Sequence, residues 1–365
     1  MTQTVLLVGG GHAHVAVLAD WIVRGAPAGV RAVLLTPQLS LRYSGMVPGW
    51  IAGQHDRDDG LVDLAALAAR AGAELVLDRC VAIDPEARRV RTAGGEDIVF
   101  EFASFDTGGE GRGAAVLGDD PRLIDVRPIG AFVDHIAALP ALSRVVVTGG
   151  GAGGVELAFA LQNRADAPSQ VALVTGDGGL LPGFARSVQR RVAHALARQG
   201  IAVHHADARI ANGAITAGGV SLEPADAIIA ALGSAAPRWA KDSGVAMDAA
   251  GFIAVDAQQR STSHPHIFAA GDVAARIDRP LAHSGVHAVF AGPVLAANLR
   301  SCLAGEPPQA AYRPRWNNLY LMNTGDGSAI ASYGPLAAEG TWVLRLKHWI
   351  DKRWIAKYAA LAKVP

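Results

Sequence analysis

The sequence predicts an α/β fold that contains two Rossmann-like dinucleotide-binding domains. The main observation is that one pattern occurs twice, beginning near residue 5 and again near residue 145: an apolar strand, a run of glycines, an apolar helix and a second strand. In both copies the spacing of apolar residues changes from strand-like to helical across the glycines. A chain of 365 residues is also long enough for two to three domains of ordinary size.

Composition narrows the class of protein. The 33 Lys and Arg residues balance 33 Asp and Glu residues, 50% of the residues are hydrophobic, and 42 are glycine. A chain with no excess of positive charge is a poor candidate for a nucleic-acid binder with a broad basic face, and this hydrophobic content argues against disorder. We therefore expect a compact, loop-rich α/β enzyme that has no nucleic-acid partner.

The two cysteines, Cys80 and Cys302, are far apart and form no Cys-x-x-Cys pair, which excludes a disulphide scaffold and a cysteine-only zinc site. The N-terminus has neither a basic region nor a small-residue cleavage site. No uninterrupted apolar stretch reaches the roughly 18 to 20 residues of a membrane-spanning helix. We expect a cytoplasmic protein whose only membrane contact would be peripheral.

The first unit has the pattern Gly9-x-Gly11-x-x-His14 after the apolar run 5–8. Its two glycines permit a tight turn and the approach of a pyrophosphate to a helix N-terminus. His14 replaces the third glycine, and alone the pattern fits a purely steric turn equally well. Thr36 occupies the position of the usual ribose-binding acid, and its hydroxyl is able to bond the ribose instead.

The second unit has the complete pattern Gly149-x-Gly151-x-x-Gly154 between an apolar strand and a helix that carries Glu156. Its second strand ends in Thr175-Gly176-Asp177 without a terminal acid, so the choice between NADH and NADPH stays open. Two interpretations apply to the basic residues of the following helix, which would either meet a 2′-phosphate or form a solvated face: Arg186, Arg190 and Arg191.

Other segments complete the outline. Short alternating runs over 90–105 predict a meander of strands that ends in the turn Asp106-Thr107-Gly108-Gly109. Further strands are expected at 227–232, before Gly233, and at 266–270, before Gly271-Asp272. A helix is expected over 286–299, and Pro307-Pro308 predicts a loop.

Together these motifs resemble the pyridine nucleotide-disulphide oxidoreductase superfamily of flavoproteins, over nearly the whole chain. The residues that carry the resemblance are 8–14, Asp106-Thr107-Gly108, the second glycine pattern with Glu156, and 262–272. Residues 43–49 and 323–327 are similar to the branch related to type-2 NADH dehydrogenases, which in some bacteria is fused ahead of selenophosphate synthetase.

The resemblance implies a domain plan and two cofactors. An FAD-binding domain would comprise residues 1–112 and 252–315, and an NAD(P)H-binding domain, residues 113–251, would be inserted in it. A C-terminal extension, 316–365, would end in an amphipathic helix. Outside this context, Gly271-Asp272 would be interpreted as an ordinary turn.

The resemblance also implies site residues. The first glycine turn would hold the FAD pyrophosphate, Asp272 the ribityl or phosphate part, the Val81 backbone the adenine, and the helix start at Gly285 the flavin pyrimidine. The full FAD set is Gly9, Gly11, His12, Ala13, Thr36, Pro37, Ser44, Val81, Thr107, Gly108, Gly271, Asp272, Gly285 and Val286. The NAD(P)H set is Gly149, Gly151, Gly153, Gly154, Thr175 and Gly233.

No cysteine occurs in the segment 41–48, where disulphide reductases of this superfamily place one against the flavin. Sulfide:quinone oxidoreductases also need such cysteines, so we expect direct hydride transfer from nicotinamide to flavin. Glu156 is predicted either to contact the nicotinamide or relay a proton, or simply to complement its helix dipole. His287, with His283, is the second catalytic candidate, as a proton donor; the pair lacks a third metal ligand, and no metal is predicted.

The tail 341–365 has six basic residues, one acid and three of the seven tryptophans. It would either lie on an anionic membrane surface, or pack as a terminal helix on the FAD domain or on a second subunit in a homodimer. Val286 and Phe290 stand where many type-2 NADH dehydrogenases have quinone-lining glutamines, which weakens the case for a quinone.

These features lead to a functional hypothesis: an FAD-dependent NAD(P)H oxidoreductase that passes electrons to a small-molecule acceptor, quinone-like or other, without a redox disulphide. Two alternatives stay open at this point, an FAD- and NADH-binding redox sensor of low turnover and a selenium-related reductase. The expected location is the cytoplasm, with the inner face of the membrane as a peripheral alternative.

Overall fold

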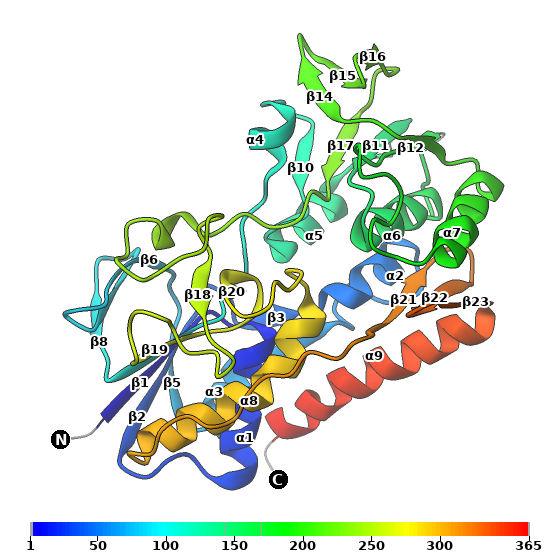
Figure 1. Cartoon of the computed structure of the whole chain (residues 1–365). Helices are drawn as coiled ribbons and strands as arrows, with labels where there is room; N and C mark the ends of the chain where they lie inside the picture. The colour runs from blue at the N-terminus through cyan, green and yellow to red at the C-terminus, as the bar shows by residue number, and fades with distance from the viewer. Residues whose placement is uncertain (1–2, 142, 169, 364–365) are drawn as a thin grey trace.

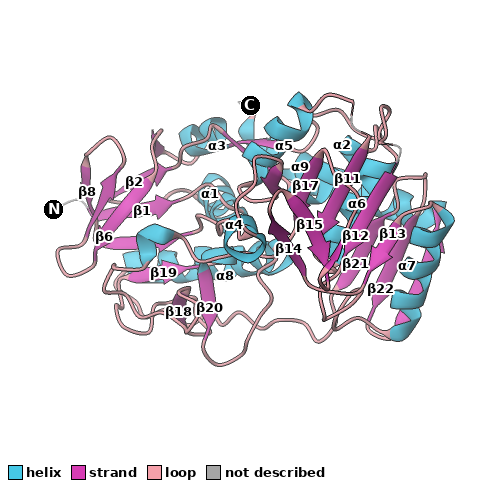
Figure 2. Cartoon of the chain, turned by 90° about the horizontal axis from the view of Figure 1, so that it is seen from above, coloured by secondary structure: helices cyan, strands magenta, loops and turns pink. Residues whose placement is uncertain are grey.

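The computed structural model describes residues 3–141, 143–168 and 170–363. The predicted ranges 1–112 and 316–365 therefore each include two residues outside the described part. Two parallel sheets dominate the structure and lie side by side (Figures 1 and 2). The first has the order β19 (Ile267–Ala269), β9 (Phe102–Phe105), β1 (Gln3–Val8), β2 (Val30–Leu35) and β5 (Ala73–Val76).

The second parallel sheet is built from the middle of the chain. Its order is β10 (Leu123–Asp125), β17 (Ala227–Ala230), β11 (Arg144–Thr148), β12 (Gln170–Val174) and β13 (Ala202–His204). The chain returns to the first sheet only afterwards, through β19, which pairs with β9. Both sheets are parallel and mostly buried, which explains why their strands read as continuous aliphatic runs in the sequence.

A helix follows each glycine turn. In the first unit α1 (His12–Arg24) packs against the long helix α8 (Gly285–Leu303), and in the second unit α6 (Ala152–Gln162) packs on β12. The other helices of the second unit are α5 (Ile129–Ala138) and α7 (Arg186–Arg198). Because the strands end where these helices begin, the N-termini of α1 and α6 lie at the carboxyl edges of their sheets.

Smaller elements surround the two sheets. Antiparallel ribbons and sheets are formed by β3 (Ser40–Arg42) with β4 (Leu61–Asp63), by β6 (Cys80–Asp84), β7 (Arg89–Thr92) and β8 (Asp97–Val99), and by β14 (Ala208–Ala211), β15 (Ala214–Ala217) and β16 (Val220–Ser221). A parallel pair joins β18 (Ile253–Val255) and β20 (Ala274–Arg276). Short helices are η1 (Ser44–Met46), α2 (Val47–Ile51), α3 (Leu64–Arg70), α4 (Gly113–Leu117), η2 (Arg238–Ala240) and η3 (Gly271–Val273).

The C-terminal extension consists of an antiparallel sheet and one long helix. The sheet contains β21 (Leu319–Asn323), β22 (Ala329–Tyr333) and β23 (Leu336–Gly340). Helix α9 (Thr341–Ala362), red in Figure 1, runs from this sheet to α1 and α3 of the first unit. The predicted terminal helix therefore exists; it packs on α1 and α3 of the first unit, and its Lys347 approaches Glu156 of the second.

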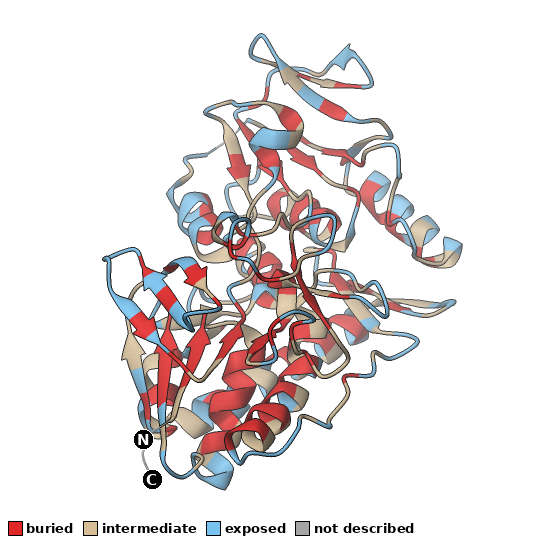
Figure 3. Cartoon of the chain, turned by 60° about the vertical axis from the view of Figure 1, so that its left-hand side comes forward, coloured by how far each residue is buried: buried red, intermediate tan, exposed pale blue. Residues whose placement is uncertain are grey.

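Each parallel sheet has its own hydrophobic core (Figure 3). In the first, Trp21 and Leu18 of α1 meet Leu295 and Leu299 of α8 beneath the sheet. In the second, Phe132 of α5, Phe159 of α6 and Val192 of α7 are buried against β11 and β12. Two separate cores of this size confirm the predicted fold class, an α/β protein with two dinucleotide-binding units, whereas the predicted domain boundaries stay predictions.

One expectation from the sequence needs correction. The strands over 90–105 are not one meander, because β9 does not join the antiparallel β6–β7–β8 sheet and pairs in parallel with β1 and β19.

One described helix, α8, is long and apolar enough to cross a bilayer by length and composition alone. However, α8 packs on α1 and pairs Arg300 with Asp20 at 2.6 Å, as the core helix of a globular unit does.

The crossing of α1 and α8 gives a stability prediction. A Cβ on Gly292 would lie 2.6 Å from the Cβ of Ala16 and 3.1 Å from the backbone of Ala13. Gly292→Val should therefore force the helices apart and lower the free energy of unfolding by about 1–3 kcal/mol. Urea denaturation would measure this, with Ala356→Val on the exposed face of α9 as the control for a β-branched residue in a helix. Equal losses in both variants would contradict it.

Candidate functional site

Both glycine turns make the same close approach to a neighbouring strand end. Gly9 and Gly149 have positive φ angles, 95° and 121°. A Cβ on Gly9 would lie 2.5 Å from the carbonyl oxygen of Asp106, and one on Gly149 would lie 2.3 Å from that of Ala231. No other residue type fits either position, because the conformation and the space both exclude a side chain.

The second turn is open in front of its helix. A Cβ on Gly151 or on Gly153 would meet no atom within 4 Å, whereas one on Gly154 would lie 2.0 Å from the carbonyl oxygen of Gly149. Gly151 and Gly153 thus leave room for a ligand, whereas Gly154 allows close packing of the helix on the strand. This arrangement fits a dinucleotide pyrophosphate at the N-terminus of α6.

His14 fills the place of the third glycine in the first turn. Its ring is fully buried, with Nδ1 2.6 Å from the carbonyl oxygen of Gly9 and Nε2 2.8 Å from the hydroxyl of Ser104. Nδ1 therefore donates to Gly9, and Nε2 accepts from Ser104. Burial lowers the pKa of His14 to about 4, which keeps the ring neutral. The residue thus holds the turn together.

Several predicted FAD residues come together at the N-termini of α1 and α8. A Cβ on Gly271 would lie 3.4 Å from Ala288 of α8, and one on Gly285 would lie 3.9 Å from the hydroxyl of Ser44. Buried polar atoms without a hydrogen-bond partner face this region, Nε2 of His12 and Oγ of Ser284. Such atoms need a partner, so the residues present fit a polar cofactor such as FAD.

Other members of the predicted FAD set lie apart from this group. Thr36 and Pro37 follow β2, and Thr36 is buried beside Gly10. Val81 lies on β6 and is 44% exposed. Thr107 and Gly108 follow β9. This spread is compatible with an extended dinucleotide that runs from the end of β2 to the start of α8.

Arg127, which was not predicted from the sequence, lies beside Asp272 of the predicted FAD set. Its guanidinium lies 2.6 Å from the Asp272 carboxylate, which also accepts a hydrogen bond from the hydroxyl of Ser234 at 3.3 Å. Arg127 precedes α5 and Ser234 follows β17, so both belong to the second unit. Nothing in the local sequence marks Arg127, because only the folded chain brings it to Asp272.

The predicted NAD(P)H residues surround the opening of the second turn. Thr175 ends β12, and its hydroxyl donates to the carbonyl oxygen of Gly176 at 3.1 Å. Gly233 follows β17 with a φ angle of 82°. Arg190 and Arg191, which are candidates for contact with a 2′-phosphate, line a surface hollow of about 390 Å³ together with Glu339 of β23.

Glu156 belongs to a buried charged cluster beside η1. Its Oε1 accepts a hydrogen bond from the backbone of Asn323 at 2.9 Å and lies 4.0 Å from Nζ of Lys347. Nζ of Lys347 also lies 3.2 Å from Asp351 and donates to the carbonyl oxygen of Gly45 at 2.9 Å. We refer to Glu156, Lys347 and Asp351 as the acid–lysine cluster. Glu156 therefore has specific charged and hydrogen-bonding partners beyond the dipole of α6.

The acid–lysine cluster can hold a proton. Burial raises the pKa of Glu156. Burial by itself would lower the pKa of Lys347, but the carboxylates of Glu156 and Asp351 outweigh it and raise that pKa above its usual value. Nothing in the sequence distinguishes Lys347 from the other five basic residues of the tail.

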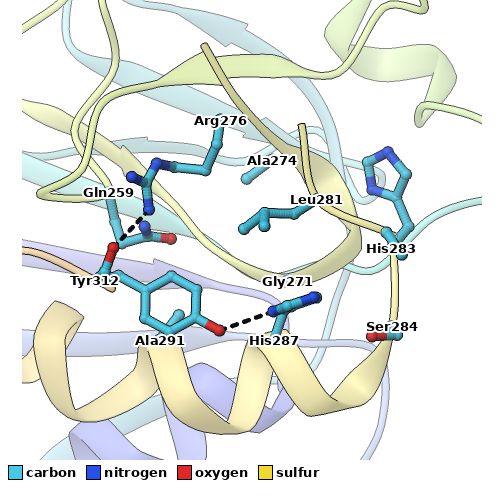
Figure 4. A pocket seen from close by; sticks show the side chains of 11 residues that line it. Gln259, Gly271, Ala274, Arg276, Leu281, His283, Ser284, His287, Ala291 and Tyr312 are labelled. Carbon is cyan, nitrogen blue, oxygen red and sulfur yellow. Dashed lines mark hydrogen bonds between the residues drawn. The ribbon is translucent and has the colours of Figure 1, made fainter. Parts of the chain in front are cut away.

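His287 lines a small cavity at the N-terminus of α8 (Figure 4). Its Nδ1 lies 2.8 Å from the hydroxyl of Tyr312. The cavity, about 20 Å³, also contains Nε2 of Gln259 and Oγ of Ser284, neither of which has a hydrogen-bond partner. A space of this size with polar walls suits an ordered water molecule. The other candidate, His283, is stacked on Phe252 at 3.9 Å.

The two thiols are unsuited to redox chemistry at this site. Cys80 begins β6 and Cys302 lies near the end of α8; both are buried. Burial raises the pKa of Cys80 to about 12 and also raises that of Cys302, and only a thiolate is a good nucleophile. Among the described residues no group of three or more His, Cys, Asp or Glu side chains is arranged to hold a metal ion.

Comparison with known proteins agrees with this geometry. The family model described as pyridine nucleotide-disulphide oxidoreductase matches residues 3–292. The chain belongs to this family. Members are FAD-dependent NAD(P)H oxidoreductases, which confirms the predicted enzyme class and cofactors at the level of the family. No curated protein matches the sequence.

Solved structures of the family share the fold. The sulfide:quinone oxidoreductase from the hyperthermophilic bacterium Aquifex aeolicus has a TM-score of 0.79 and 18% identity, covering 98% of this chain and 92% of that chain. The covalent putidaredoxin reductase–putidaredoxin complex gives 0.74 and 20%, covering 91% and 81%. The water-forming NADH oxidase from Lactobacillus brevis, bound to NADH, gives 0.72 and 18%, covering 92% and 75%.

The neutral histidines of the first turn give a pH prediction. The pKa of His14 is lowered to about 4 in the folded state, from 6.5 in the unfolded state. The associated stability is therefore full above pH 6.5 and is lost as the pH falls to 4, by about 3 kcal/mol. In urea denaturation at several pH values, His14→Gln should lose correspondingly less stability on acidification. His194→Gln, exposed on α7, is the control; wild-type behaviour in His14→Gln would contradict the assignment.

Proposed function

We propose that this protein is an NAD(P)H oxidoreductase that binds FAD in its first unit and NAD(P)H in its second, and that passes electrons to a small-molecule acceptor without a redox disulphide. The observation that carries the proposal is the acid–lysine cluster: it lies against Gly45, in the segment where disulphide reductases of the family have a cysteine. In this proposal the acid–lysine cluster, which can hold a proton, takes the place of the redox-active cysteine of the disulphide reductases.

The chain's residues have distinct tasks in this proposal. Bound FAD would supply the site that takes a hydride from nicotinamide and returns electrons to the acceptor. The N-terminus of α1, where Asp106 already accepts from the amides of Ala13 and His14, would hold its phosphates together with the Arg127 guanidinium, and Asp272 would accept from its hydroxyl groups. The open turn at Gly151 and Gly153 binds the nicotinamide dinucleotide. Glu156 and Lys347 exchange the proton that the acceptor takes up.

The acceptor is proposed to be a small molecule, with a quinone as one candidate class. Phe290, where a quinone-lining glutamine is common in related enzymes, is 39% exposed and lies under the Arg315 guanidinium at 4.6 Å. This surface offers a flat apolar face and guanidinium donors, which suit a neutral ring that carries carbonyl acceptors. The low-turnover sensor is less favoured, because a sensor has no need for a buried proton-holding cluster beside its cofactor.

The chemistry is tested by spectroscopy and by one variant. Purified protein should contain flavin, and anaerobic NADH or NADPH should bleach it; absence of flavin after reconstitution would refute the proposal. Glu156→Gln keeps the acceptor for the Asn323 amide but removes the charge. It should retain flavin and slow reoxidation by a quinone about 100-fold, while reoxidation by ferricyanide, which takes up no proton, stays near wild type. Equal slowing with both acceptors would contradict a role in proton transfer.

We also propose that the protein is cytoplasmic and touches the inner face of the membrane through α9. The face of α9 away from the core exposes Trp342, Arg345, Trp349, Lys352 and Lys357, while Lys347, Asp351 and Tyr358 are buried on the other face. Tryptophan and lysine side chains together suit the surface of an anionic bilayer. The alternative occupant of this face is a second subunit.

Vesicle sedimentation tests the contact. Wild-type protein should sediment with vesicles that contain phosphatidylglycerol and not with phosphatidylcholine alone. The triple variant Trp349→Ser, Lys352→Glu and Lys357→Glu should lose about 10-fold to 100-fold in vesicle affinity, since each basic residue contributes about 1 kcal/mol. Arg190→Glu with Arg191→Glu on α7 is the control for charge. Equal binding by the triple variant and wild type would discard the membrane contact, and dimer dissociation in that variant would support the second subunit.

A further inference from the structure

The two glycine turns can be compared atom by atom because they are built alike. The strand that follows each unit donates back to its first strand: the amide of Asp106 donates to Val8 at 2.9 Å, and that of Ala231 donates to Thr148 at 2.8 Å. Asp106 and Ala231 are also the residues whose carbonyl oxygens approach the first glycines. They are thus equivalent positions, and the first unit has a carboxylate where the second has a methyl group.

The Asp106 carboxylate occupies the N-terminus of α1. Its Oδ2 accepts hydrogen bonds from the amides of Ala13 at 2.7 Å and His14 at 3.1 Å. A Cβ on Gly11 would lie 2.3 Å from this carboxyl group, whereas the equivalent Gly151 has nothing within 4 Å. The first unit has therefore filled, with its own anion, the space that the second unit leaves open for a phosphate.

Two anions at one helix N-terminus would repel each other in a buried site. A neutral carboxylic acid would not, and its hydroxyl is a donor that a phosphate oxygen can accept. The oxygen available for this is Oδ1, which lies 2.5 Å from the Cβ position of Gly271 and has no hydrogen-bond partner among the described residues. Gly271 and Asp272 both belong to the predicted FAD set, so Oδ1 lies beside residues that are predicted to bind FAD.

We propose that Asp106 shares the N-terminus of α1 with the FAD pyrophosphate as a neutral acid that donates a hydrogen bond to it, so that FAD binding takes up one proton. The inference rests on the proposed function, since it places FAD in the first unit. The carboxylate of Asp106 gains one proton from solvent as the dianionic cofactor binds, and no electron is transferred.

The surroundings of Asp106 make this protonation easy. Burial, with a further contribution from Asp272 in η3, raises the pKa of Asp106 to about 7 even though it accepts two amide hydrogen bonds from α1. Nearby titratable groups are His12 and His14 of α1, both with pKa lowered to about 4 by burial, and Arg127 beyond Asp272. Burial also lowers the pKa of His283, before α8, and of His287, in its first turn. The histidines are neutral near pH 7, so Asp106 is the group that changes charge there.

The proposal predicts a pH dependence with a definite sign. Below about pH 7 Asp106 is already protonated, and the dissociation constant of FAD should be nearly constant. Above that pH each bound FAD takes up one proton, so the dissociation constant should rise by up to about tenfold per pH unit. The FAD pyrophosphate itself carries two negative charges throughout this range and adds no such dependence.

Binding of FAD to flavin-depleted full-length protein, followed by flavin fluorescence from about pH 6 to about pH 9, tests this. Asp106→Asn mimics the neutral acid and should bind FAD with the low-pH affinity of wild type at every pH. Ala231→Asp, the matched change in the second unit, should leave FAD binding unchanged and make NAD(P)H binding pH-dependent. A pH-independent dissociation constant in wild type, or the wild-type pH dependence in Asp106→Asn, would overturn the proposal.

A second measurement needs no variant. Calorimetric titration of wild type with FAD at about pH 8, in two buffers of different ionisation enthalpy, should show uptake of close to one proton; zero uptake would overturn the proposal. Failure of wild type to bind FAD at all would instead refute the proposed function. Tight, pH-independent binding without proton uptake would refute only the role of Asp106.

Discussion

The close approach of each glycine turn to the neighbouring strand end is the constraint on which the rest of the structure depends. At Gly9 and Gly149 the backbone comes so near to the carbonyl oxygens of Asp106 and Ala231 that no side chain fits. This contact fixes where α1 and α6 begin. It thereby places both helix N-termini at the sheet edges where phosphates bind.

Helix α9 makes the second decisive contribution, because it joins the two units at the site. It brings Lys347 to Glu156 of the second unit and to Gly45 of the first, and it stacks Trp354 on Tyr43 at 4.7 Å. The two cysteines lie elsewhere and are buried, so the charged side chains of Glu156, Lys347 and Asp351 meet beside η1 without a thiol among them.

Much of this could be predicted from the sequence, for local reasons. Aliphatic runs and glycine patterns gave the paired strands and helices, since parallel strands buried on both faces are continuously apolar. The site residues in the glycine turns follow from the same pattern. In contrast, Arg127 and Lys347 carry no local signal. Asp106 is marked in the sequence only as part of a turn, because its significance depends on the N-terminus of α1 lying opposite.

The sequence by itself determined the family, the two cofactor-binding units and the lack of redox cysteines, because these depend on residue identity and short-range spacing. Only the tertiary structure decided which charges meet. It paired Arg127 with Asp272, closed Glu156 and Lys347 into one cluster, and set Asp106 at the start of α1. Electrostatic interactions between buried groups depend on distance and desolvation, and neither can be read from positions along a chain.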